Sequence, residues 1–258
     1  MDLSLKQRFL DAWRQHFGDA DLPIALWYSD QPIVPLPEPG ERSRCFIAYL
    51  DRVFKGAALS VDLDSVGCVG GKRYLGFTET MSPTIHYFLS CGIPGKLEGE
   101  RYKKTPDIAK ASIARSPAFH APGMYLNARR WDQLQPNDTP QLVVFFADAD
   151  ALSGLFTLAN FDREDAHGVI APFGAGCSAV VYHPFRERSE TRPRAVLGMF
   201  DPSARPYIEP EKLSFAVPME RFADMVGWMP QSFLVAPAWR RLRERFGGRA
   251  LPEEARER

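Results

Sequence analysis

The stretch QLVVFFA at residues 141–147 carries the clearest secondary-structure signal in the chain. A short, continuous apolar run of this length, rich in β-branched and aromatic residues, is typical of a buried strand. Asp148 then stands at the N-cap position of a segment with apolar residues at helical spacing, which are Leu152, Leu155, Phe156 and Ala159. The sequence therefore predicts a buried strand followed directly by a helix.

Strand and helix signals alternate on both sides of this unit. Further strands are predicted at residues 23–28, 57–63, 168–173, 195–200 and 213–217. Further helices are predicted at residues 3–17, 43–54, 82–92, 105–116 and 219–228. Such alternation favours an α/β fold with a mixed, partly parallel sheet flanked by helices. We therefore expect residues 1–230 to form a single α/β domain.

The pattern changes in residues 231–258. The segment WRRLRERF at residues 239–246 predicts a basic amphipathic helix, and residues 251–258 form a charged tail. We expect this helix to dock on the domain with a frayed end, as chain termini commonly do. The alternative is an interaction protein that uses this helix, for example on nucleic acid, although the rest of the chain offers no basic surface to extend the contact.

The composition is that of a soluble globular protein, with 45% hydrophobic and 25% charged residues. Lys plus Arg and Asp plus Glu each total 32, so no net field favours nucleic acid or an anionic membrane. No apolar run approaches the roughly 20 residues that span a bilayer, and the first residues lack the apolar core of a signal peptide. We expect a cytoplasmic protein, and nothing here predicts its oligomeric state.

Four cysteines in a chain of this length without an export signal do not indicate a disulfide framework. Two of them lie in glycine-rich segments, GCVGGKR at residues 67–73 and GAGCS at residues 174–178. Glycine permits backbone conformations closed to other residues and lets a ligand approach the main chain closely. Together with Cys45, therefore, Cys68 and Cys177 predict a thiol-lined site assembled from distant segments.

The first glycine segment does not match a nucleotide-hydrolysing P-loop, because Val66 replaces its first glycine and Arg73 replaces the serine or threonine after the lysine. A weaker anion site remains, in which the amides of Gly70 and Gly71 act with Lys72 and Arg73 on a carboxylate or phosphate. Gly176 and Ser178 of the second segment complete the predicted ligand-binding residues. The alternative for the first segment is a tight turn with two solvated cations.

The second glycine segment resembles a nucleophile elbow only in part. That motif needs glycine two residues before and after the nucleophile, but Ala175 and Ala179 occupy these positions around Cys177. His183 is the nearest histidine in sequence, and six residues along a helix would not place it on the same face as Cys177. An α/β-hydrolase mechanism is therefore not supported, and the sequence names no catalytic residue.

The cysteines fit better as metal ligands. Cys45 in a helix first turn, and Cys68 and Cys177 at turns before helices, would lie near positive dipole ends that lower a thiol pKa from about 8.5 towards neutrality or below. Thiolate is the form that binds soft metals and iron–sulfur clusters. Cys91 falls at a helix C-terminus, where the dipole opposes thiolate. We expect Cys91 to be a small buried residue instead.

The chain resembles the uncharacterised domain of unknown function 169, also called the ArCR family, from about Leu22 to Val226. The resemblance depends on Arg44-Cys45, on CVGG at residues 68–71 with Leu75-Gly76, on the strand at residues 142–146, on GAGCS at residues 174–178 and on the helix at residues 220–226. It implies no established activity. Members commonly carry a further cysteine in a Gly-Cys-Asn-Gly-like segment, where this chain has LGMFD at residues 197–201 with Met199 in place of cysteine.

Two main functional hypotheses follow. The first is a protein that holds an iron–sulfur cluster or another soft metal through Cys45, Cys68 and Cys177, next to a small anionic ligand. The second is a metal-free module in which the glycine turns bind a small anionic metabolite and the cysteines merely line the pocket. Neither hypothesis specifies a reaction, a substrate or the metal, or says whether Met199 replaces a family cysteine.

Overall fold

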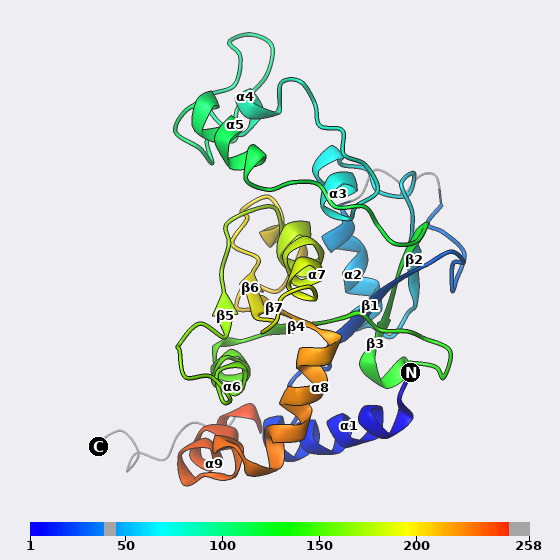
Figure 1. The fold of residues 1–258 in the computed structure, drawn as a ribbon, viewed down its shortest axis with the longest axis vertical. Helices are drawn as coiled ribbons and strands as arrows, with labels where there is room; N and C mark the ends of the chain where they lie inside the picture. Colours follow the sequence, from blue (N-terminus) through cyan, green and yellow to red (C-terminus); the bar gives the residue numbers. More distant parts are fainter. Residues whose placement is uncertain (39–44, 248–258) are drawn as a thin grey trace.

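The computed structural model describes residues 1–38 and 45–247, and over these residues the strands form one seven-stranded sheet (Figure 1). The strand order is β2-β3-β1-β4-β7-β6-β5. The strands are β1 (Ile24–Ser29), β2 (Leu59–Val61), β3 (Tyr125–Arg130), β4 (Leu142–Ala147), β5 (Val169–Ile170), β6 (Ala195–Gly198) and β7 (Leu213–Pro218). Strand β4, predicted from its apolar run, lies at the centre of the sheet and is buried along its whole length.

The sheet is mixed, as predicted, but its parallel part is small. Strands β5 and β6 pair in parallel, with Val169 opposite Ala195, and the other neighbouring pairs are antiparallel. In β4, Val144 faces Ile24 of β1 and Ala216 of β7. The chain therefore has the expected α/β architecture with one parallel pair at the edge of the sheet.

The helices flank this sheet, and their ends follow from local capping. They are α1 (Leu3–Phe17), α2 (Phe46–Phe54), α3 (Val69–Tyr74), α4 (Ile85–Phe88), α5 (Pro106–Ala114), α6 (Ala149–Ala159), α7 (His183–Glu187), α8 (Met219–Trp228) and α9 (Pro237–Arg243). The carboxylate of Asp148 accepts a hydrogen bond from the amide of Ala151 at the start of α6, as its N-cap position predicts. Gly18, with a φ of 61°, ends α1.

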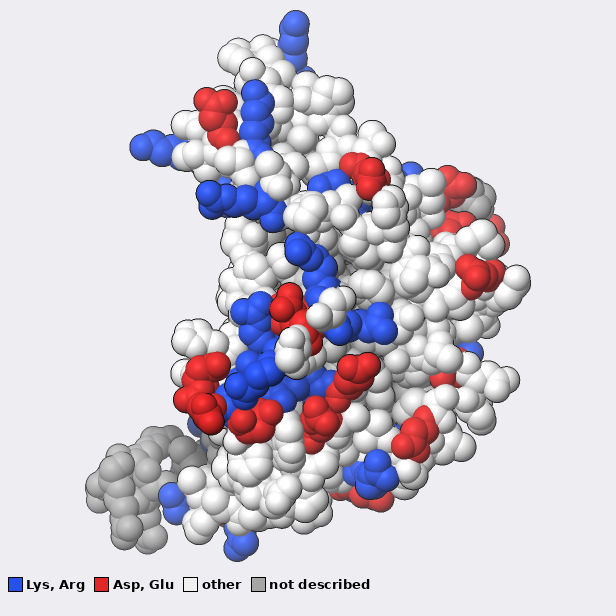
Figure 2. All heavy atoms as spheres, viewed as in Figure 1, with Lys and Arg blue, Asp and Glu red and all other residues white. Residues whose placement is uncertain are grey.

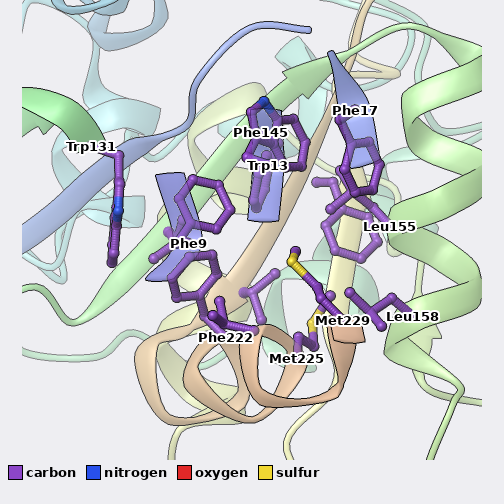
Figure 3. Close-up of a cluster of buried hydrophobic side chains, with 14 of the residues drawn as sticks. Phe9, Trp13, Phe17, Trp131, Phe145, Leu155, Leu158, Phe222, Met225 and Met229 are labelled. Carbon is purple, nitrogen blue, oxygen red and sulfur yellow. The ribbon is translucent and has the colours of Figure 1, made fainter. Parts of the chain in front are cut away.

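One face of the sheet packs against α1, α6, α8 and α9 (Figure 1). Figure 3 shows the aromatic centre of this layer, where Phe9 and Trp13 of α1 meet Phe145 of β4 and Phe222 of α8. The ring centroids of Phe9 and Phe222 are 5.0 Å apart, within the range for favourable aromatic pairs. This layer is a closed apolar core, and it leaves the opposite face of the sheet for the cysteine segments.

The opposite face carries α2, α3 and α7, together with a π-helical turn at Ser178–Tyr182 that leads into α7. Alternate residues of the central strands, such as Leu26 and Val144, point to this side, whereas Ala25 and Val143 point to the first. Cys177 and Met199 are buried in this second layer. Both glycine-rich cysteine segments therefore lie on the same side of the sheet.

Residues 77–120, which we call the excursion, connect α3 to β3 and include α4 and α5. Figure 1 shows the excursion projecting from the body of the molecule beyond α3 and α7. Arg73 anchors its two ends, because its guanidinium donates hydrogen bonds to the carbonyl oxygens of Glu79 and Ser116 at 2.9 and 2.8 Å. The excursion is thus held to the main body beside the cysteine segments.

Some elements differ from the sequence predictions. Strand β3 (YLNARR) was not predicted, because its polar residues and paired arginines are not typical of a strand. Its pairing with β1 and β2 stabilises it in the fold. Ser43, the expected cap of the second helix, lies outside the described residues, and Cys45 is the N-cap of α2 rather than part of its first turn. Only Ile85–Phe88 of the predicted helix at residues 82–92 is helical. Cys91 is exposed, so the prediction that it is buried was wrong.

Helix α9 docks on the first layer, as expected for the segment after residue 230. Trp239 is 4% exposed and its indole N–H donates a hydrogen bond to the carbonyl oxygen of His16 at 2.8 Å. On the face in Figure 2, acidic and basic side chains are intermixed over the main body of the molecule. Within residues 1–38 and 45–247, we find no helix with the length and apolar character needed to cross a membrane.

Candidate functional site

The three cysteines singled out from the sequence line one cavity on the second face of the sheet. The cavity has a volume of about 350 Å³, and Cys45, Cys68 and Cys177 all border it. Its floor comes from the N-terminal ends of α2, α3 and the π-helical turn, and its walls come from the excursion and the loop after β5. Folding therefore brings together thiols from residues 45, 68 and 177.

Cys45 is the N-cap of α2 and is half-buried. The pKa of its thiol is lowered to about 7, chiefly by a hydrogen bond with the Cys177 thiol and also by the backbone N–H groups of Ile47 and Ala48, with burial opposing these effects. The thiolate is the nucleophilic and metal-binding form of cysteine, and the lowered pKa favours this form at Cys45 near neutral pH.

Cys68 is the N-cap of α3, and its sulfur accepts a hydrogen bond from the amide of Gly71 at 3.1 Å. A Cβ atom at Gly71 would lie 2.8 Å from the Cys68 sulfur and 3.8 Å from the Cys177 sulfur. Any larger residue at position 71 would force the Cys68 thiol and the Val66 side chain to shift, which favours glycine here. Both sulfurs lie close to this one Cβ position. The distance between the Cys68 and Cys177 sulfurs is therefore at most the sum of their two distances to it.

Cys177 is buried directly before the π-helical turn, with 3% of its surface exposed. Its pKa is raised well above the ordinary value, first by its hydrogen bond with Cys45 and then by burial and the charges of Cys45, Cys68 and Asp201. Burial also raises the pKa of Cys68. A lowered pKa, predicted for all three thiols, is thus found at Cys45 and not at the other two, because the hydrogen bond with Cys45 and burial raise the pKa of Cys177 and burial raises that of Cys68.

Asp201 organises the back of the cavity, a role that the sequence did not predict. Asp201 is 5% exposed, and its carboxylate accepts hydrogen bonds from the Tyr102 hydroxyl at 3.2 Å and the Gly176 amide at 3.2 Å. It also accepts bonds from the amide and hydroxyl of Ser203, at 3.0 and 2.8 Å. Asp201 thereby links the excursion to the turn that carries Cys177.

The predicted anion-binding residues divide into two groups. Gly70, Gly71, Gly176 and Ser178 line the cavity. Lys72 and Arg73 are not among its lining residues, and Arg73 instead supports the excursion as described above. Among the described residues, the lysine or arginine that borders the cavity is Lys103 of the excursion, whose ammonium lies 5.6 Å from the ring centre of Phe173.

The walls of the cavity are apolar, which the sequence did not reveal. The excursion contributes Ile85, Phe88 and Ile113, and the loop after β5 contributes Phe173. The rings of Tyr102 and Phe173 meet edge to face with centroids 5.9 Å apart, so the two walls are in contact. A ligand in this cavity would lie between apolar walls above a floor of thiols.

His183 of α7 also borders the cavity. Burial is the main cause that lowers its pKa to about 4, and the nearby Arg186 lowers it as well. The imidazole is therefore neutral near pH 7 and carries a lone pair. Cys177 and His183, paired from sequence with little support, do share this cavity, although the π-helical turn between them was not predicted.

A model of one protein family matches residues 21–227, which include every residue of the cavity. The chain belongs to the uncharacterised ArCR family, DUF169. No curated protein and no solved structure gives a significant match. The resemblance stated from the cysteine and glycine segments is thus confirmed over nearly the same range.

Met199, at the position where the resemblance led us to expect a cysteine, is 1% exposed. Its sulfur would be 3.2 Å from a Cβ atom at Gly176 and is not part of the cavity lining. Its φ of 68° lies in the left-handed region, which non-glycine residues rarely adopt. Met199 therefore packs against the Gly176 turn without lining the cavity.

The cavity lacks a preformed coordination sphere. Across the described parts of the chain, no group of three or more His, Cys, Asp or Glu side chains is arranged to hold a metal ion. The three thiols border one cavity but do not surround one point at bonding distance, so a metal would require the side chains to move inward.

Proposed function

We propose that the protein binds a small, largely apolar molecule in this cavity and that the Cys45 thiolate reacts with an electrophilic group of this molecule. The observation that carries the proposal is the position of Cys45, whose thiol lies on the floor of a cavity with apolar walls beside a second thiol. A volume of about 350 Å³ suits a small organic ligand.

The lining indicates what such a ligand looks like. Phe88 and Phe173 favour an apolar or aromatic body, and Lys103 at the same wall favours a carboxylate or phosphate on it. A small anionic molecule was expected from the sequence, and Lys103 now supplies its cation in place of Lys72 and Arg73. The balanced charge of the chain, 32 basic and 32 acidic residues, favours such a ligand over nucleic acid or a membrane surface.

We expect the protein to act in the cytoplasm, because a thiol site of this kind depends on reduced cysteines. All four cysteines are free, and Cys91 and Cys68 are exposed. Reducing conditions keep such thiols from forming disulfides.

Alkylation tests the proposal. With iodoacetamide, we expect Cys45 to react first, at a rate that rises about tenfold per pH unit in acid and levels off above a midpoint near its pKa of about 7. The sign follows from the pKa: a lowered value means that thiolate, and hence reactivity, is already present at neutral pH. Peptide mapping by mass spectrometry assigns the alkylated residue.

The apolar walls add a second readout. An aryl iodoacetamide should alkylate Cys45 about tenfold faster than iodoacetamide does, because its ring is buried against Phe88 and Phe173. The Phe173→Ala variant should lose most of this advantage, whereas Cys91→Ser, outside the cavity, should keep it. Two results together would refute the proposal. Cys45 would be alkylated with a midpoint above pH 8.5, as an ordinary thiol is, and the aryl reagent would react no faster than iodoacetamide.

A soft-metal or iron–sulfur centre held by Cys45, Cys68 and Cys177 is the second candidate. It is favoured by one observation, the convergence of three thiols at helix N-termini on one cavity. A bound cation would stabilise the thiolate forms of Cys68 and Cys177, whose pKa values are raised chiefly by burial for Cys68 and by the hydrogen bond with Cys45 and burial for Cys177. His183 and Asp201 border the same cavity and could complete the ligand set.

Metal binding predicts a distinct result. Protein purified without oxygen should show charge-transfer absorption and stoichiometric metal, and a chelator or the Cys68→Ser substitution should abolish both. Cys91→Ser, which changes a cysteine outside the cavity, is the matched control. Colourless protein without stoichiometric metal would exclude this candidate and leave the thiol-reactive pocket.

A further inference from the structure

We propose that Cys45 and Cys177 are a two-electron redox couple that reduces an organic hydroperoxide bound in the cavity, with Cys45 as the attacking thiolate and Cys177 as the resolving thiol. This inference rests on the proposed function, because it uses the same cavity and the same nucleophile. It goes further by naming a partner thiol, a substrate class and a product.

The first argument is that the two thiols already face each other. Both thiols border one cavity, and their interaction lowers the pKa of Cys45 and raises that of Cys177, which favours the thiolate on Cys45. Cys177 is 3% exposed, so an oxidant in solvent reaches it far less readily than it reaches the half-buried Cys45. Its greater exposure and lower pKa therefore make Cys45 the attacking thiolate, and Cys177 is the resolving thiol.

The second argument is that the segments carrying the thiols are packed together. A Cβ atom at Gly176 would lie 3.1 Å from Cγ1 of Ile47, so the turn before Cys177 touches the first turn of α2. Both segments lie in the same apolar layer on one face of the sheet. A disulfide between Cys45 and Cys177 then requires side-chain rotation and a small approach, without separation of the two elements.

The chemistry balances with one named co-reactant. The Cys45 thiolate attacks the terminal oxygen of the hydroperoxide; a sulfur–oxygen bond forms, the oxygen–oxygen bond breaks, and the departing alkoxide takes a proton from water to give an alcohol. The sulfur of Cys177 then attacks the sulfenic sulfur of Cys45, and the hydroxide that leaves takes the Cys177 proton to give water. Two thiols are oxidised to a disulfide, the hydroperoxide is reduced, and an external dithiol restores the couple.

The walls define the substrate class. Hydrogen peroxide would gain nothing from Ile85, Phe88 and Phe173, whereas an organic hydroperoxide buries its hydrocarbon body against them. The hydroperoxide group then points to the floor of the cavity, where Cys45 lies. The structure thus favours an apolar hydroperoxide over hydrogen peroxide.

Titration of the reduced protein with cumene hydroperoxide tests the inference. One equivalent should produce a Cys45–Cys177 disulfide, identified by non-reducing peptide mapping, and should react about tenfold faster than hydrogen peroxide because one apolar group is buried. In Cys177→Ser, Cys45 should instead accumulate as sulfenic acid that dimedone traps. Cys91→Ser, which changes an exposed cysteine outside the cavity, should form the disulfide as the unaltered protein does.

The outcomes separate this inference from the proposed function. If Cys45 is alkylated with a midpoint near pH 7 but cumene hydroperoxide gives no Cys45–Cys177 disulfide, the redox couple is refuted and the thiol-reactive pocket stands. A Cys45–Cys68 disulfide would also overturn the inference, because it assigns the resolving role to another thiol. Equal rates with both peroxides would refute the substrate class.

Discussion

Replacement of Asp201 by alanine should lower the free energy of unfolding by about 3 kcal/mol and, in the protein that remains folded, make Cys45 ionise at lower pH. The carboxylate is buried and accepts four hydrogen bonds, from Tyr102, Gly176 and Ser203. Its loss leaves the Gly176 amide buried without this acceptor. Urea denaturation followed by circular dichroism measures the first effect.

The second effect follows from the sign of the charge. Asp201 raises the pKa of Cys45 by repelling the thiolate, so its removal should shift the alkylation midpoint below about 7. Asp201→Asn separates the two effects, since it removes the charge and retains one acceptor oxygen. Its NH2 group replaces the oxygen that accepts from Gly176, so we expect Asn to lose less stability than Ala but not to match the unaltered protein, and to show the same downward shift. An unchanged midpoint in both variants would contradict this account of the site.

Replacement of Trp239 by alanine should lower the free energy of unfolding by about 4 kcal/mol, as expected for a large aromatic side chain removed from a core. Trp239 is 4% exposed, its ring centre lies 5.1 Å from that of Phe17, and its indole donates to the His16 carbonyl. A Cβ atom at Gly154 would lie 2.3 Å from the indole, so α6 has glycine where the ring packs.

Arg240→Ala on the same helix is the matched control for Trp239→Ala. Arg240 is exposed, and its replacement should change stability by less than about 0.5 kcal/mol. If Trp239→Ala unfolds at the same urea concentration as the unaltered protein, then α9 does not contribute to the core in solution. The cavity lies on the other face of the sheet, so Cys45 in folded Trp239→Ala should keep its alkylation midpoint.

Local signals were sufficient for much of the fold. The apolar run at residues 142–147 predicted β4, and the Asp148 carboxylate caps α6 as its position indicated. Strand β3 could not be predicted, because its sequence YLNARR has weak strand character and depends on hydrogen bonds with β1 and β2. The strand order and the single parallel pair also depend on contacts between distant segments, which periodicity does not record.

The candidate site was predictable in part. Glycine beside Cys68 and Cys177 marked segments that approach closely, and a side chain at Gly71 would displace the Cys68 sulfur and Val66. Asp201, Tyr102 and Lys103 carry no local signal, because each acquires its role only from the groups it meets across the cavity. The order of the thiol pKa values could not be predicted from the sequence either, since burial and contacts between thiols are properties of the folded state.

By itself, the sequence determined that the chain alternates strands with helices, belongs with the ArCR family and places three cysteines at the starts of helices or turns. Capping, apolar periodicity and glycine are local properties, and they act through neighbours in the chain. Only the tertiary structure decided that Cys45 and Cys177 form a pair, that Asp201 joins the excursion to the Cys177 turn, and that the walls above the thiols are apolar. Those features arise where residues far apart in the chain exclude water from one another, and no local pattern encodes that burial.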